Sequence, residues 1–124
     1  MTLSKQTPVE DMPDIRVPVD TVCFIISKAH EFAQAGRQGK SYEAEMSSFI
    51  SDLSDGAQID LVAIMWMGRG DGPDTWDEAK RIAEDEHNDH TASYLCGTPL
   101  LADFLEEGLS LIGRDCSAYS ETTV

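Results

Sequence analysis

The densest group of possible metal ligands in this sequence lies near residue 87, where an expected helix ends. His87 and His90 are three residues apart and can face one way on a helix, and Glu84 and Asp85 stand just before them. Imidazole with nearby carboxylates suits zinc or another divalent transition metal. The structural alternative is that histidines at a helix C-terminus offset the helix dipole and the acids beside them. The structural role is favoured, and a divalent metal is the only cofactor that the sequence suggests.

A second candidate is the loop 69–74, Arg-Gly-Asp-Gly-Pro-Asp. A calcium-binding loop is excluded, because Pro73 occupies a position that must supply an oxygen ligand. The loop also lacks the lysine of a phosphate-binding loop. It is predicted to be a helix–helix connection in which Gly68 ends the preceding helix. The alternative is a ligand or partner contact through Arg69 and Asp71, since loops often carry function.

Three further side chains, two beside this loop and one before the last expected helix, each have a functional and a structural interpretation. Trp66 and Trp76 flank the loop, where they either pack the corner between two helices or form a ligand cage. Cys96 would need a base such as His87 or His90 to act as a nucleophile, and a small buried apolar side chain is the simpler role. With no nucleophile elbow, HExxH or dinucleotide fingerprint in the chain, the sequence predicts no catalytic residue.

Apolar stripes at helical spacing predict an all-α fold, a compact bundle of about five helices in one domain. The expected helices cover approximately residues 21–35, 42–53, 56–67, 76–87 and 99–112, with a turn or short helix at 91–95. The expected N-caps are Asp20, Ser41, Asp55, Thr75 and Thr98, and the expected stop residues are Gly36, Gly68 and Gly113. This helical domain is predicted to span residues 19–113. It follows an extended, mobile arm with three prolines at 1–18 and precedes a loose polar tail at 114–124.

The third expected helix is apolar nearly all round, which is typical of a central core helix. A domain this small has little room to cover every face of such a helix, so self-association would bury the rest. Met65 and Met67, with Leu100 and Leu101, are the candidates for that exposed patch. Burial of Met65, Trp66 and Met67 within one chain would count against this interpretation.

Composition limits the partners. The chain has 124 residues, a net charge of -14 and an isoelectric point near 4.3, so nucleic acids and anionic membranes are excluded as partners. No apolar run approaches the roughly 20 residues that span a bilayer, and the N-terminus does not resemble a secretory signal. The three cysteines have no C-x-x-C spacing, which argues against a disulfide framework and for a reducing cytoplasm.

Several segments resemble an uncharacterised bacterial family, a domain of unknown function. The most specific strings are MWMGRGD at 65–71 and GTPLLAD at 97–103, and the resemblance runs from about Val22 to Ile112. The resemblance implies a helical domain in a bacterium and brings no activity with it. The chain departs from the family pattern at His90, where arginine is expected, and at Cys96, where leucine is expected.

These observations favour a small acidic cytoplasmic interaction or regulatory module that binds a protein partner or a second copy of itself. The alternative is a metal-dependent protein or enzyme that uses His87, His90, Arg69 and Asp71. A third possibility is an acidic binder of a basic protein, whose affinity would fall steeply with salt.

Overall fold

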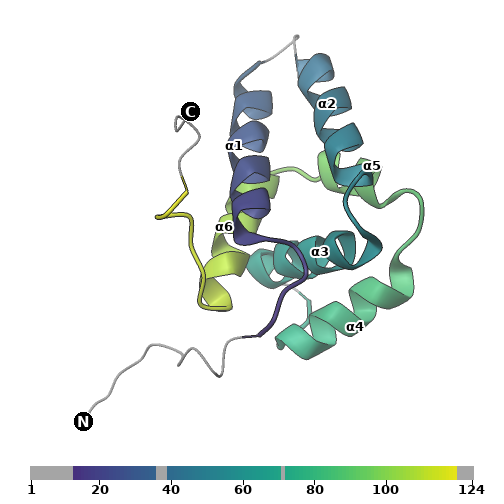
Figure 1. The fold of residues 1–124 in the computed structure, drawn as a ribbon, viewed down its shortest axis with the longest axis vertical. Helices are drawn as coiled ribbons and strands as arrows, with labels where there is room; N and C mark the ends of the chain where they lie inside the picture. The colour runs from purple at the N-terminus through teal and green to yellow at the C-terminus, as the bar shows by residue number, and fades with distance from the viewer. Residues whose placement is uncertain (1–12, 36–38, 71, 120–124) are drawn as a thin grey trace.

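The computed structural model describes residues 13–35, 39–70 and 72–119, and these residues form six helices and no strand. The helices are α1 (Val19–Ala35), α2 (Gly39–Ser51), α3 (Asp55–Arg69), α4 (Trp76–Glu86), α5 (Thr91–Cys96) and α6 (Leu101–Leu111). The predicted all-α fold is confirmed (Figure 1). The five longer helices lie where the apolar stripes predict them, and the segment at 91–95 is the short helix α5.

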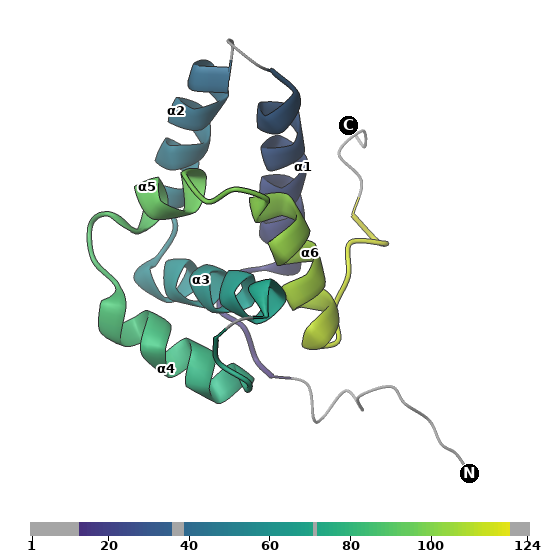
Figure 2. The ribbon, with the colours of Figure 1, turned by 180° about the vertical axis from the view of Figure 1, so that it is seen from behind.

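The helices are arranged around α3. α1 and α2 lie side by side, α3 crosses beneath them, and α4 lies along the opposite side of α3 (Figure 1, Figure 2). α6 packs on both α3 and α1, while α5 bridges α2 and α3. This arrangement covers α3 from several directions.

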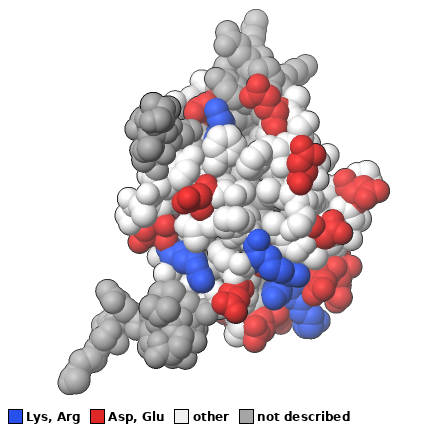
Figure 3. Space-filling model, viewed as in Figure 1, with Lys and Arg blue, Asp and Glu red and all other residues white. Residues whose placement is uncertain are grey.

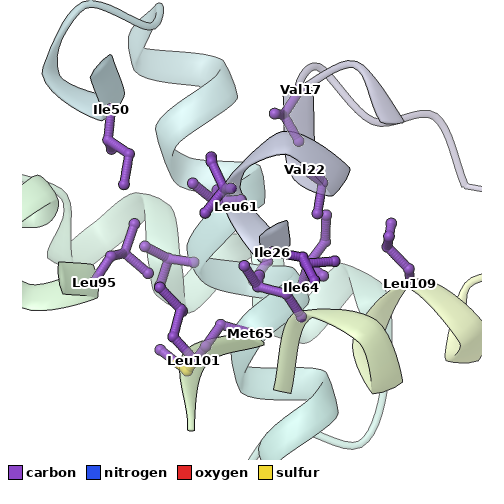
Figure 4. Close-up of a cluster of buried hydrophobic side chains, with 14 of the residues drawn as sticks. Val17, Val22, Ile26, Ile50, Leu61, Ile64, Met65, Leu95, Leu101 and Leu109 are labelled. Carbon is purple, nitrogen blue, oxygen red and sulfur yellow. The ribbon is translucent and has the colours of Figure 1, made fainter. Parts of the chain in front are cut away.

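The buried side chains of α3 form the centre of the core. Leu61, Ile64 and Met65 are completely buried, and Figure 4 shows side chains from α1, α2, α5 and α6 converging on them. Trp66 is only 8% exposed and Met67 is partly buried. The prediction that an apolar face of α3 stays exposed is therefore wrong, because α4 and α6 cover that face within one chain.

Two glycines let α3 and α6 touch through their backbones. A Cβ added to Gly68 would collide with the Phe104 carbonyl oxygen, and one added to Gly108 would collide with the Ile64 carbonyl oxygen. Gly68 thus lies inside α3 and does not end it, contrary to the prediction. The helix ends at Arg69 and is capped by Gly70, whose φ of 80° is left-handed and whose N–H donates to the Trp66 carbonyl.

The segment just before α1 is anchored on α3 by a buried charge. The Asp60 carboxylate is completely buried, and Arg16 donates to it from its backbone N–H (2.6 Å), Nε (3.2 Å) and Nη2 (2.8 Å). The hydrogen bond to Asp60 raises the pKa of Arg16. Val17, next in the chain, is fully buried. The end of the expected mobile arm is therefore packed on the domain, and residues 1–12 lie outside the described residues.

A disulfide joins Cys23 in α1 to Cys116 just beyond α6, with the two Cα atoms 5.8 Å apart. The cysteine spacing argued against such a bridge, and that interpretation is wrong. The disulfide, with the partly buried Tyr119, also fixes the part of the tail that was expected to be loose. Residues 120–124 lie outside the described part of the chain.

Two of the predicted helix boundaries are confirmed by the local backbone geometry. The Thr75 side chain accepts from the Glu78 N–H at 3.2 Å, as an N-cap should, and Gly113 follows α6 with a φ of 83°. The N-cap of α3 is Ser54, one residue before the predicted Asp55, and its side chain accepts from the Ala57 N–H.

At the other boundaries the structure differs from the prediction. α1 begins at Val19, so Asp20 lies in its first turn, and α6 begins at Leu101 after a left-handed Leu100 (φ 61°). Thr98 does not cap α6, because its hydroxyl donates to the Tyr94 carbonyl of α5. Ser41 falls within α2, but its side chain lies outside the described residues, and so does residue 36.

Acidic side chains are spread over the visible face of the molecule, and the Lys and Arg side chains gather mostly in its lower half (Figure 3). This distribution matches the net charge of -14. In the described part of the chain, every helix is too short or too polar to cross a membrane.

Candidate functional site

A groove between α3, α4 and α5 has a cavity of about 250 Å³ and is lined by both apolar and polar side chains. Its lining residues come from these three helices and the turn that joins α4 to α5: Val62, Trp66, Ala83, Glu86, His87, Asn88, His90, Thr91 and Tyr94. Val62 and Ala83 form an apolar floor, and the other side chains supply aromatic faces and hydrogen-bonding groups. We call this concavity the α3–α4–α5 groove.

The Tyr94 hydroxyl organises one wall of the groove. Its oxygen accepts from Trp66 Nε1 at 2.9 Å and lies 3.5 Å from Arg69 Nη1. Because the oxygen accepts these donors, the hydroxyl proton is available to a ligand acceptor. A second, more open cleft lined by Arg69 shares Trp66, Glu86 and Tyr94 with the groove. The two concavities therefore meet at one wall, which places Arg69 beside the groove.

His87 is held at the inner end of the groove. Its Nε2 lies 3.3 Å from Gln58 Oε1 and 3.9 Å from Asp55 Oδ1, and its side chain is 19% exposed. The Gln58 amide nitrogen donates to the carbonyls of Ser51 and Leu53, so Gln58 Oε1 is the acceptor for His87. Neutral His87 therefore carries its proton on Nε2 and leaves Nδ1 as an acceptor.

His90 is presented at the mouth of the groove by a tight turn. Asn88 Oδ1 accepts from the His90 N–H at 2.7 Å, and the Thr91 hydroxyl donates to the Asn88 carbonyl at 3.0 Å. These bonds form an Asx-type turn and start α5 at Thr91. His90 is exposed and occupies the N-cap position of α5.

The predicted metal ligands are only partly brought together. His87 and His90 line the same groove, whereas Glu84 is exposed on α4 and is not part of its lining. Across residues 13–35, 39–70 and 72–119, the ligand atoms of these three side chains do not form a group within 4.8 Å of one another. Asp71 lies outside the described residues.

The two tryptophans have different positions. Trp76 is 9% exposed, belongs to the core cluster and does not line the groove, in agreement with the packing interpretation. Trp66 also belongs to the core cluster, but one edge of it forms the groove wall. The aromatic partner of Trp66 in the groove is therefore Tyr94, and Trp76 takes no part in it.

Cys96 is buried at the end of α5 and is 5% exposed. Burial, with a smaller contribution from Glu43, raises the pKa of its thiol to about 11. A thiol with this pKa is protonated at neutral pH, so Cys96 has the role of a small apolar side chain.

Six residues of the groove were not predicted as site residues from the sequence: Val62, Ala83, Glu86, Asn88, Thr91 and Tyr94. For the turn a signal is present in the sequence, because asparagine followed three residues later by threonine is typical of a turn that begins a helix. Tyr94 carries no such signal, since its role depends on the approach of α5 to α3.

The six helices, with the groove on one side of α3, define a small all-α protein. Residues 43–114, more than half of the chain, match a family described as a protein of unknown function (DUF3775), and the chain belongs to that family. The match runs from α2 to just beyond α6 and confirms the resemblance to a domain of unknown function. No curated protein and no solved structure matches the chain.

Proposed function

We propose that this protein is a regulatory binding module that holds a small ligand in the α3–α4–α5 groove without changing it chemically. One observation carries the proposal: three helices bring Trp66, His87, His90 and Tyr94 to one groove, and the adjoining cleft places Arg69 beside the Tyr94 hydroxyl. A concave site with an apolar floor and a few convergent polar groups is the usual form of a small-molecule site.

The groove favours a flat aromatic ligand that carries a carboxylate. Val62, Ala83 and the edge of Trp66 offer apolar surface to a ring. The Tyr94 hydroxyl proton and the Arg69 guanidinium lie along one wall and suit a carboxylate oxygen. A ring and an anionic end thus match the two kinds of surface that meet in this groove.

Binding without catalysis is favoured by the state of the candidate nucleophiles. The Thr91 hydroxyl is buried and already donates to the Asn88 carbonyl. The Cys96 thiol is buried and protonated at neutral pH. The alternative from the sequence, a metal-dependent role, would have to recruit a third ligand beyond His87 and His90.

Self-association was predicted from an exposed apolar patch around α3. Met65 and Leu101 of that patch are buried, and Leu100 is its one exposed member in the described part of the chain. We therefore propose a small ligand ahead of self-association or a protein partner. Native mass spectrometry of the untagged chain separates these possibilities, because a monomer with added mass supports the groove and a bare dimer supports self-association.

The disulfide bears on the predicted cytoplasmic location. That location was predicted on the assumption of unpaired thiols, whereas Cys23 and Cys116 form a disulfide, which is rare in reducing compartments.

The direct test is an NMR titration of the ¹⁵N-labelled full chain with 2-naphthoate, a ring with a carboxylate. We expect saturable chemical-shift changes confined to amides of α3, α4, α5 and the 87–90 turn. Tyr94→Ala should abolish them, whereas Ser93→Ala, a change at the neighbouring exposed position on α5, should leave them intact. Scattered shifts, or equal binding by Tyr94→Ala, would contradict the proposal.

A further inference from the structure

A second group of side chains, away from the groove, has the composition of a metal site. The geometry points to a zinc-binding site formed by His30 of α1 with Asp103 and Glu106 of α6. One nitrogen and two carboxylate oxygens of these residues all lie within 4.8 Å of one another. Nitrogen and oxygen donors in this combination suit Zn²⁺.

The two helices supply the ligands in a favourable arrangement. Asp103 and Glu106 are three residues apart and share one side of α6, and α1 packs beside α6 with His30 in its C-terminal half. Two ligands on a tetrahedral zinc ion are about 3.4 Å apart, given bonds of about 2.0–2.1 Å. The three side chains are exposed, so rotation about their own bonds closes the remaining gap without moving the helices.

The three side chains have no other structural role in the described part of the molecule. None of them forms a side-chain hydrogen bond or ion pair with another described residue. Lys28 and Glu31, in the same region of α1, do pair with each other at 3.5 Å. Two neighbouring carboxylates repel each other in a chain whose net charge is -14, and a bound dication would remove that repulsion.

The disulfide holds the two ligand-bearing helices together. Cys23 lies about two turns before His30 on α1, and Cys116 lies just beyond the end of α6. This covalent link limits sliding of one helix along the other, so the ligands on the two helices stay in register. Preorganised ligands bind a metal more tightly than ligands that must first be ordered.

The site also opens towards a cavity. Three protein ligands leave a coordination position for water or a small anion, as in catalytic zinc sites. His30 and Asp103 line a cavity of about 190 Å³ whose other walls include the apolar side chains of Phe32, Met46 and Leu101. A group bound to the zinc ion on this side would therefore contact a largely apolar surface.

The test is isothermal titration of the full, untagged, chelator-treated chain with ZnCl₂. We expect one zinc ion per chain, and His30→Ala, Asp103→Asn and Glu106→Gln should each weaken binding by about ten-fold or more. Glu107→Gln is the matched control, because it removes the same charge from the adjacent exposed position of α6 and should change the affinity less than about two-fold.

Two further measurements distinguish zinc bound at this site from zinc bound elsewhere on the chain. Titration with Co²⁺ should give the visible absorption of a low-coordinate nitrogen–oxygen site, and His30→Ala should remove it. Circular dichroism should show unchanged helix content in all variants, since the altered residues are exposed. If wild type binds no zinc, if Glu107→Gln is as damaging as Glu106→Gln, or if His90→Ala removes binding while His30→Ala does not, the proposal is wrong.

Discussion

Two clusters of charged side chains join distant parts of this chain, and they differ in burial and in partners. The Asp60 carboxylate is completely buried and accepts three hydrogen bonds from Arg16. His30, Asp103 and Glu106 are exposed, and no other described residue bonds to their side chains. A buried charge persists only when it is paired, whereas an exposed cluster of charged side chains contributes little to the stability of the fold. The first cluster is therefore structural, and the second is available to a ligand.

The side chains of the groove are intermediate between these two clusters in burial and in hydrogen bonding. His87 is fixed by Gln58, and Tyr94 accepts from Trp66, yet both side chains still face a cavity. A binding site requires side chains that are fixed by hydrogen bonds to the protein and still exposed to the cavity. Substitutions in each region, and one thiol reagent, test this comparison from the largest expected effect to none.

The largest effect is expected where the chain is closed covalently. Cys116→Ser opens a loop of 93 residues and should lower the free energy of unfolding by roughly 3 to 4 kcal/mol, because the unfolded chain regains conformational freedom. Urea denaturation measures the change. A reducing agent should destabilise the wild type and leave Cys116→Ser unaffected. Equal stability of the oxidised wild type and the variant would mean that the bridge does not constrain the fold.

Removing the partner of the buried carboxylate should have the next largest effect. Arg16→Ala leaves the Asp60 side chain with only the backbone N–H of residue 16, and should cost about 3 kcal/mol by urea denaturation. The control is Lys28→Ala, which breaks the exposed pair with Glu31 and should cost less than about 0.5 kcal/mol. If the two variants lose similar stability, the contrast between buried and exposed charges does not hold.

An intermediate effect is expected in the groove. Tyr94→Phe removes the acceptor for Trp66 Nε1 and should cost about 1 kcal/mol, the usual value of one hydrogen bond. Thermal denaturation monitored by circular dichroism measures this loss, and Ser93→Ala serves as the control. A loss of stability above about 3 kcal/mol would mean that Tyr94 is a core residue and not a binding residue.

The exposed cluster should tolerate change. His30→Ala and Asp103→Asn should each alter stability by less than about 0.5 kcal/mol in the presence of chelator, because neither side chain has a partner to lose among the described residues. With excess ZnCl₂, the melting temperature of the wild type should rise and that of each variant should not. A large loss in chelator would show that the cluster has a structural role.

The last test expects no reaction in the folded protein. The Cys96 thiol has a pKa of about 11, so at pH 8 only about one molecule in a thousand carries the thiolate. Ellman's reagent should therefore react with almost no thiol in the native chain and with one equivalent after unfolding in urea, since the other two cysteines are paired. Rapid reaction of the native protein would require an exposed Cys96.

The helices of this protein could be predicted because their signals are local. The apolar stripe of α3 and the Thr75–Glu78 cap depend only on spacing within a few residues, and both are confirmed. Within the candidate site, His87 and His90 could be placed together because one turn separates them. For these features, residues close together in the sequence were sufficient for a correct prediction.

The features that were missed depend on contacts between distant segments. Asp60 sits in an apolar run, and its partner Arg16 is 44 residues away. Cys23 and Cys116 are 93 residues apart, and Cys96 makes the number of cysteines odd. For both reasons the disulfide was not predicted from the sequence. Pairings of this kind are set by how the helices cross, and periodicity carries no information on crossing.

The backbone contact between α3 and α6 has a consequence for how the molecule opens. With Gly68 against Phe104 and Gly108 against Ile64, neither helix can loosen without breaking this close backbone packing. Amide hydrogens around these four residues should exchange with solvent water only through global unfolding, and they should be the slowest in the chain. The groove and the cluster of His30, Asp103 and Glu106 would then fluctuate on the outside of a single cooperative unit that opens all at once.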